Sequence, residues 1–168
     1  MKRHQALRDL SSDHHQGLVQ ARRMIRAASG ESAAPQPQLA ASGEDVEASQ
    51  VAQVAREFLA FWAEHTEPHF REEEEVLLPA FAVYGKTSAK PIVRMLADHV
   101  AIRHMVSELS SQVDGNQSYS KTMRTIGEML RAHIRHEENL VFPLIEEAMP
   151  EEALQELCRQ LGVVAHRE

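Results

Sequence analysis

The amino-acid sequence predicts an all-α protein, an antiparallel up-down four-helix bundle with a short extra helix at the C-terminus. Strand signals are missing, because aromatic residues make up only 5% of the chain and no β-branched run alternates with polar residues. Apolar residues recur instead at spacings of three and four, as on one face of a helix. Four long amphipathic segments of this kind favour a bundle, since each must bury its apolar stripe against the others.

The length of 168 residues suits one domain with a sizeable core. We therefore predict a single domain over residues 1–168, with the bundle over about residues 5–148 and the C-terminal helix over about 150–162.

The first helix is predicted from an apolar stripe and ends before Gly30. The stripe consists of Leu7, Leu10, Leu18, Ala21 and Ile25. Residues 31–45 contain two prolines, one glycine and several small polar residues, which indicates a linker. The linker is either a crossing loop within the bundle or a domain boundary.

The second helix is predicted from about Val46 to Leu77, closed by Pro79. Pro68 lies inside this pattern. Because proline has no backbone N–H, it should kink or interrupt the helix near residues 64–67.

The third helix is predicted from about Pro91 through Leu109, since proline is favoured in a first helical turn. The polar, glycine-containing loop 110–118 then stops it. A fourth helix should run over residues 119–148, with Pro143 kinking it or marking its end. A short fifth helix should follow Pro150.

Composition excludes several classes of function. With 25 acidic and 18 basic residues the net charge is −7, which argues against a nucleic-acid partner. The single cysteine, Cys158, rules out an internal disulfide and any cysteine-based metal site. No apolar stretch approaches the length of a membrane span, and the polar start lacks a signal-peptide core. We expect a soluble cytoplasmic protein that makes no use of a membrane.

Histidine is unusually frequent, with ten residues, and four of them stand in a repeated pattern. The second and fourth helices each contain a histidine, three residues, a glutamate, five residues and a proline: His69, Glu73 and Pro79, and 64 residues later His133, Glu137 and Pro143. Residues four apart share a helix face. Each imidazole should therefore lie beside its carboxylate.

The first and third helices carry a second pattern. His14 and His99 each follow an aspartate, and each continues the apolar stripe of its helix. Both should point inward, so every helix of the bundle offers one interior histidine. Asp13 and Asp98 either accept a ring proton from a histidine of a neighbouring helix or are exposed.

Burying a carboxylate in an apolar bundle costs on the order of several kcal/mol unless its charge is compensated, and this bundle would bury two. No interior lysine or arginine stands in obvious register, whereas two divalent metal ions would compensate the charge. The set divides evenly, with two histidines for each metal and both glutamates bridging. A solvent-derived bridge would leave a position open on each ion, and mixed N and O ligation suits iron best, manganese or zinc less well. The predicted ligands are His14, His69, Glu73, His99, His133 and Glu137.

These motifs resemble the hemerythrin-like family, in particular the bacterial HHE cation-binding proteins. The resemblance covers residues 7–148 and implies a non-haem di-iron centre in a four-helix bundle that binds dioxygen or a related small molecule. By position it implies four terminal histidine ligands, with Glu73 and Glu137 as bridges.

Two positions depart from the oxygen-carrying hemerythrins. Those proteins have a second histidine four residues after the first on the third helix, where this chain has Arg103. They also place the carboxylate of the fourth helix five residues after its histidine, which would select Glu138 instead of Glu137. The pattern therefore looks more like the sensory, iron-handling or iron-repair relatives than like a carrier.

The remaining polar residues are assigned no ligand role. Only Glu73 in the run 72–75 has the register of the interior, so the rest should form a solvated face. The other six histidines have at best a position behind the ligands: His4, His15, His65, His104, His136 and His166.

The leading prediction is a protein that holds two iron ions and coordinates dioxygen, peroxide or nitric oxide for sensing, storage or protection. One alternative is a di-iron oxidoreductase or a protein that repairs iron clusters. The other is an adaptor bundle stabilised by its metal. The sequence shows no substrate-pocket signature and no general acid beyond the ligands, which favours a binding protein over an enzyme without deciding the matter. It leaves the oligomeric state open, a homodimer included.

Overall fold

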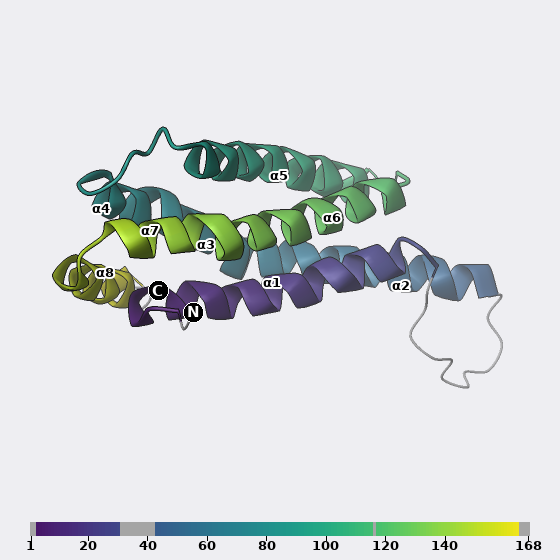
Figure 1. Cartoon of the computed structure of the whole chain (residues 1–168). Coiled ribbons are helices and arrows are strands. Elements are labelled where there is room, and N and C mark those ends of the chain that lie inside the picture. The colour runs from purple at the N-terminus through teal and green to yellow at the C-terminus, as the bar shows by residue number, and fades with distance from the viewer. Residues whose placement is uncertain (1–2, 31–42, 116, 165–168) are drawn as a thin grey trace.

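The computed structural model describes residues 3–30, 43–115 and 117–164, and every regular element within these ranges is a helix (Figure 1). The first helical stretch joins η1 (Gln5–Leu7) and α1 (Arg8–Ala27). The second joins α2 (Gly43–Phe61), η2 (Trp62–Thr66), α3 (Glu67–Glu72), η3 (Glu73–Leu77) and α4 (Leu78–Ala82). The third is α5 (Lys90–Asp114). The fourth joins α6 (Ser120–His136), η4 (Glu137–Val141) and α7 (Phe142–Ala148), and α8 (Glu151–Val164) follows.

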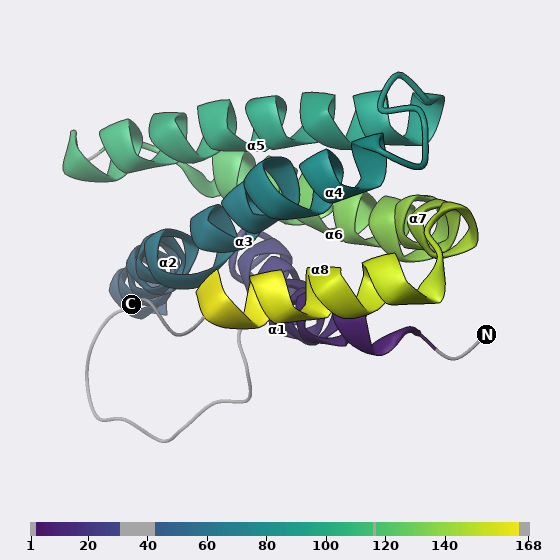
Figure 2. The ribbon, with the colours of Figure 1, turned by 90° about the vertical axis from the view of Figure 1, so that its left-hand side faces the viewer.

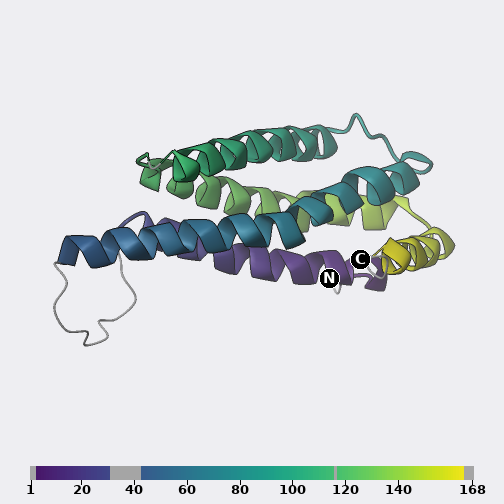
Figure 3. The same cartoon turned by 180° about the vertical axis from the view of Figure 1, so that it is seen from behind.

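The four long stretches run side by side, alternately up and down (Figures 1 and 3). Going round the bundle, α1 packs on α2, α2 on α5, α5 on α6, and α6 on α1. The short helix α8 lies against η1 and η3 at one end (Figure 2). The predicted all-α bundle with a C-terminal helix is therefore confirmed.

Some predicted helix ends were wrong. Pro79 does not close the second stretch, which continues to Ala82, and the predicted loop 110–118 is helical through Asp114. Polar residues at the end of α5 extend the helix until Gly115 follows it. The predicted linker 31–45 lies outside the described residues up to 42, and its last three residues already belong to α2.

A wide π-helical turn precedes Pro68, Pro79 and Pro143, the prolines in the middle of the second and fourth stretches. The N–H just before the proline bonds to a carbonyl five residues back, from Glu67 to Trp62, from Leu78 to Glu73 and from Phe142 to Glu137. Proline lacks an N–H, and in a regular α-helix its ring would collide with a carbonyl four residues earlier. The wider turn accommodates the ring, so the chain continues as helix. The predicted interruption near residues 64–67 is the π-turn η2.

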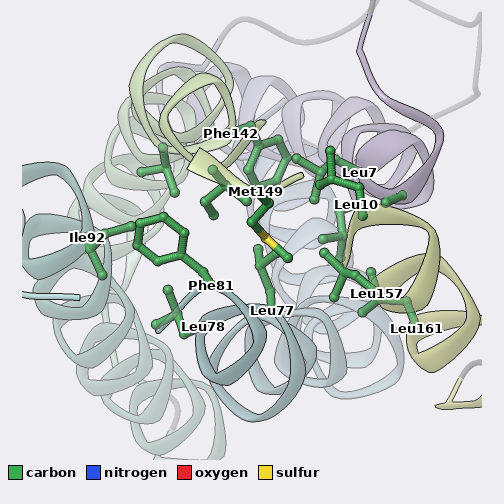
Figure 4. Packing of buried hydrophobic residues seen from close by; sticks show 14 of the residues in the cluster. Leu7, Leu10, Leu77, Leu78, Phe81, Ile92, Phe142, Met149, Leu157 and Leu161 are labelled. Atoms are coloured by element: carbon green, nitrogen blue, oxygen red, sulfur yellow. The ribbon is translucent and has the colours of Figure 1, made fainter. Parts of the chain in front are cut away.

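The interior consists of two apolar clusters. The cluster beside α8 includes Leu10, Leu77, Ile92 and Phe142 (Figure 4). The cluster towards the other end includes Ala21, Phe70, Ile102 and Leu130. On each long stretch the histidine predicted as a ligand falls between a residue of one cluster and a residue of the other. The polar residues thus form a layer sealed by hydrocarbon on both sides. Within the described residues, no helix is long and apolar enough to cross a membrane.

Close packing of α1 against α6 depends on Gly127. A Cβ atom there would lie 2.8 Å from the carbonyl oxygen of Ala21 and 2.8 Å from Ile25 Cγ1. Gly127→Ala should lower the unfolding free energy by about 1–2 kcal/mol, because overpacking outweighs the gain in helix propensity. Denaturant titration measures this difference.

Gly17→Ala on α1 is the matched control, since its Cβ would meet only the flexible end of Ile134, at 3.0 Å. This variant should differ from the wild type by less than about 0.5 kcal/mol or gain stability from helix propensity. Equal loss in the two variants would contradict the packing argument.

Candidate metal centre

The structure brings all six predicted ligands together in the polar layer between the two clusters. Each of these side chains is at most 5% exposed. His14 comes from α1, His69 from α3, His99 from α5 and His133 from α6, while Glu73 and Glu137 open the π-turns η3 and η4. The fourfold inward register expected from the sequence is therefore found, and the two glutamates occupy the wide turns that the following prolines require.

One half of the layer contains His14 and His69 with both glutamates. The Nε2 atoms of the two histidines are 3.0 Å apart. His14 Nε2 lies 3.0 Å from Glu137 Oε2, and His69 Nε2 lies 3.5 Å from Glu73 Oε1. One nitrogen or oxygen atom from each of the four residues lies within 4.8 Å of the corresponding atoms of the other three.

The other half contains His99 and His133 with the same two glutamates. His99 Nε2 lies 3.3 Å from Glu73 Oε2, and His133 Nε2 lies 3.0 Å from Glu137 Oε1. The two imidazole pairs match in orientation, with ring centroids 4.9 Å and 4.8 Å apart and both at 69°. Each histidine belongs to one half and each glutamate to both, which is the division predicted for two metal ions.

The buried nitrogen and oxygen atoms of this layer are better placed to bind a cation than to form hydrogen bonds with one another. Within the described residues, both carboxylate oxygens of Glu73 and Glu137 and the Nε2 atoms of His99 and His133 have no hydrogen-bond partner. The Nε2 atoms of His14 and His69 are 3.0 Å apart. Two nitrogens bound to one metal ion at about 2.1 Å, with a right angle between the two bonds, would be separated by the same distance. Four imidazoles and two carboxylates are the mixed donors that iron, manganese and zinc accept.

Charge in the layer is balanced by protons when no metal is bound. Burial by itself lowers the pKa of His14, but its close contact with Glu137 and its hydrogen bond to Glu138 outweigh burial and raise the pKa to about 9. Burial likewise lowers the pKa of His99, and contacts with Glu137 and Glu73 raise it to about 9. A metal ion must displace these protons, because it binds the neutral imidazole.

A comparison with family models agrees with this geometry. The model described as hemerythrin HHE cation binding domain matches residues 3–145. The chain belongs to the hemerythrin HHE cation-binding family. No match was found among curated proteins or among solved structures. Membership explains the layer of buried histidine and glutamate as a cation site.

The helix-four carboxylate that faces this hemerythrin-type layer is Glu137, which is fully buried. Glu138, the alternative, turns outward and accepts a hydrogen bond of 2.7 Å from His14 Nδ1. Burial raises the pKa of Glu138, but contacts that include His14 and Arg3 lower it to about 2. Glu138 therefore supports a candidate ligand from behind as an ionised carboxylate.

Glu74 has the same position on the other half, which corrects the prediction of a solvated face. It accepts a hydrogen bond of 2.7 Å from His99 Nδ1 and is half-buried. The missed signal was the repeat itself, because Glu74 follows Glu73 as Glu138 follows Glu137.

Asp13 and Asp98 face the two remaining histidines through longer contacts. Asp13 lies 3.4 Å from His69 Nδ1, and Asp98 lies 3.9 Å from His133 Nδ1. Each partner is on a neighbouring helix, but within the described residues neither Nδ1 atom has a hydrogen-bond partner. Asp13 is 54% exposed and Asp98 is half-buried. Each aspartate is therefore a nearby negative charge, without the hydrogen bond of the first alternative. All four imidazoles thus have a carboxylate behind them, each next in sequence to a candidate ligand.

The other histidines stay out of the layer. His15, His65 and His104 are exposed, and His166 lies outside the described residues. His136 is buried, and its Nε2 is 2.9 Å from the carbonyl of Pro91, where α6 meets α5. His4 accepts a hydrogen bond from the N–H of Ala6 at the start of the chain.

A small cavity of about 30 Å³ reaches the first half of the layer. His14, His69 and His133 lie on its inner side, and its lining includes Gly17, His65 and Thr66. The exposed residues Asp13, Gln16 and His65 line the cavity towards solvent, and Thr66 lines it as a buried polar residue. The volume equals roughly that of one water molecule in the liquid, so it suits a ligand of two or three atoms.

Proposed function

We propose that the protein binds two iron ions at the six-residue layer and coordinates a small diatomic ligand, namely dioxygen, peroxide or nitric oxide, for sensing, storage or protection. The observation that carries the proposal is the cavity that opens on the layer beside His14 and His69. Bound iron would supply the open coordination positions at which such a ligand attaches. Zinc or manganese would satisfy the same donors with less preference.

The chain's own residues would hold the ions and shape the space around the ligand. Glu73 and Glu137 would contribute one oxygen to each ion, since each belongs to both groups of donors. Hydrocarbon on both sides of the layer limits the access of bulk water to the side where the cavity opens. The proposal includes a cytoplasmic location, with which a chain that has a single cysteine is compatible.

The size of the cavity favours ligand binding over turnover of a larger substrate. Typical sites for drug-sized molecules occupy roughly 300–1,000 Å³, whereas this cavity has about 30 Å³. A di-iron oxidoreductase remains the alternative for a substrate as small as peroxide. Steady consumption of peroxide by the iron-loaded protein, lost in His69→Ala, would establish the enzyme.

The test is an optical titration of the iron-loaded full chain. We expect two iron ions per chain and a near-ultraviolet charge-transfer band that shifts when azide or nitric oxide is added. Gly17→Leu should keep both iron ions but slow or abolish the azide shift, because the new side chain fills the cavity.

Val19→Leu is the control, because it adds bulk to the same helix at a side chain that is 44% exposed. This variant should behave as the wild type does. A wild-type protein with no adduct band, or well under two equivalents of metal, would refute the proposed function. An azide shift that is as fast in Gly17→Leu as in the wild type would refute the cavity as the route.

A further inference from the structure

Behind the second half of the centre, an arginine reaches a candidate ligand through a glutamate. Arg103 on α5 donates hydrogen bonds of 2.7 and 3.2 Å to the two oxygens of Glu74. Glu74 in turn accepts the 2.7 Å bond from His99 Nδ1. Arg103 is held on its other side by Glu67, at 2.9 and 3.1 Å. The guanidinium therefore fixes the carboxylate that fixes the imidazole.

The first half of the centre has the same chain of contacts. Arg3, which precedes η1, donates a bond of 2.7 Å to Glu138 Oε2, and Glu138 Oε1 lies 2.7 Å from His14 Nδ1. Arg3 also donates to the carbonyl oxygen of Glu138 at 2.8 Å and to Glu146 at 2.9 Å. Both arginines are half-buried and doubly anchored.

An aromatic ring also packs against each of the histidines His99 and His14. Phe70 stacks on His99, with centroids 3.8 Å apart and ring planes at 10°, and Phe142 stacks on His14 at 5.2 Å and 12°. The guanidinium carbon of Arg103 lies 5.5 Å from the Phe70 ring, and that of Arg3 lies 5.2 Å from the Phe142 ring. Each histidine is thus confined from the side by an arene and from behind by an ionised pair.

The internal repeat does not account for the two arginines. Corresponding residues of the second and fourth helices are 64 apart, and His14 and His99 are 85 apart. Arg3 and Arg103 are 100 apart, one before the first helix and the other inside the third. Two unrelated parts of the chain supply the same contact to equivalent histidines, which indicates a requirement of the centre itself.

We propose that Arg3 and Arg103 are positioning residues for the metal centre, each holding one histidine of one metal ion through Glu138 or Glu74. The inference rests on the proposed binding of two metal ions. A carboxylate on Nδ1 fixes the tautomer that leaves Nε2 free for the metal, and the arginine keeps that carboxylate in place. His69 and His133 have the longer aspartate contacts. Each ion would therefore have one firmly and one loosely held imidazole.

Arg103 also gives a reason for the departure from the oxygen carriers. It stands where those proteins have an additional histidine, and its side chain bonds Glu67 and Glu74 instead of entering the layer. The third helix thus supplies one candidate ligand, His99, and the support for it. As a result, the six candidate ligands would divide equally between two metal ions.

Stepwise zinc binding to the full chain, measured against a competing chelator, tests the positioning role. Outer partners of metal ligands contribute about 10- to 100-fold to affinity, so Arg103→Met should weaken one of the two zinc-binding steps at least about tenfold. Arg3→Met should weaken the other step, and the double variant should weaken both. Arg103→Lys should recover part of the affinity, because lysine keeps the charge without the fork. Anomalous scattering from zinc in crystals identifies the half that each variant affects.

Arg23→Met is the matched control, because it removes an exposed ion pair with Glu57 at a distance from the layer. It should leave both zinc steps unchanged. If Arg3→Met and Arg103→Met unfold more easily without metal but bind two zinc ions as tightly as the wild type, the arginines make only structural salt bridges and the inference is wrong. A wild type that fails to bind two zinc ions would refute the proposed function instead.

Discussion

Glu137→Gln is expected to abolish tight binding of both metal ions, whereas His69→Ala should abolish tight binding of only one. The reason is the sharing seen in the layer, where Glu137 contacts His14 in one half and His133 in the other, at 3.0 Å each. His69 belongs to one half only. An amide keeps the size of the side chain but loses the charge that bridges two cations. Metal content after loading with excess zinc or ferrous iron, followed by desalting, measures the stoichiometry.

Glu138→Gln is the control for this prediction, since Glu138 is the next residue and faces His14 from outside. It should retain two metal ions with reduced affinity for one of them. Circular dichroism of each metal-free variant shows whether the bundle still forms. Two tightly bound ions in Glu137→Gln, or loss of both in His69→Ala, would contradict the assignment of the glutamates as bridges.

Residue spacing was sufficient to predict the inner layer. His14 and His99 continue apolar stripes, so their direction followed from helix geometry alone. The pairs His69 with Glu73 and His133 with Glu137 followed from the four-residue rule. Six side chains in matched register left little freedom, and the structure places all of them in the layer.

Sequence periodicity could not predict the surroundings of that layer. A π-turn begins at Glu73 and at Glu137, and its wider path changes which of the following residues face a neighbouring helix. Glu74 therefore reaches His99, although an α-helical projection left it in solvent. Arg3 precedes the first helix, where no periodicity applies, and its partner Glu138 lies 135 residues away. Contacts of this kind depend on the tertiary fold.

Removing the metal is expected to cause the largest change in stability. Each ion present at a thousandfold excess over its Kd would add about 4 kcal/mol to the unfolding free energy. For a chain of this length, two such ions raise the melting temperature by roughly 15–30 °C. Without them, two fully buried carboxylates depend on imidazolium partners alone. Thermal denaturation of the zinc-loaded and chelator-treated protein measures the difference, and equal melting temperatures would contradict the prediction.

The difference in melting temperature between the zinc-loaded and the metal-free protein should widen as pH rises from about 6.5 towards 9. In the metal-free protein, the pKa of His14 and of His99 is raised from 6.5 to about 9, so the stability that these ion pairs contribute is full below 6.5 and lost as pH approaches 9. Metal binding changes in the opposite direction, because protons compete for the same nitrogens and leave as pH rises. Melting curves of both forms at pH 6.5 and pH 8.5, bracketing most of this window, test the sign. A gap that narrows with rising pH would mean that the metal does not bind at these imidazoles.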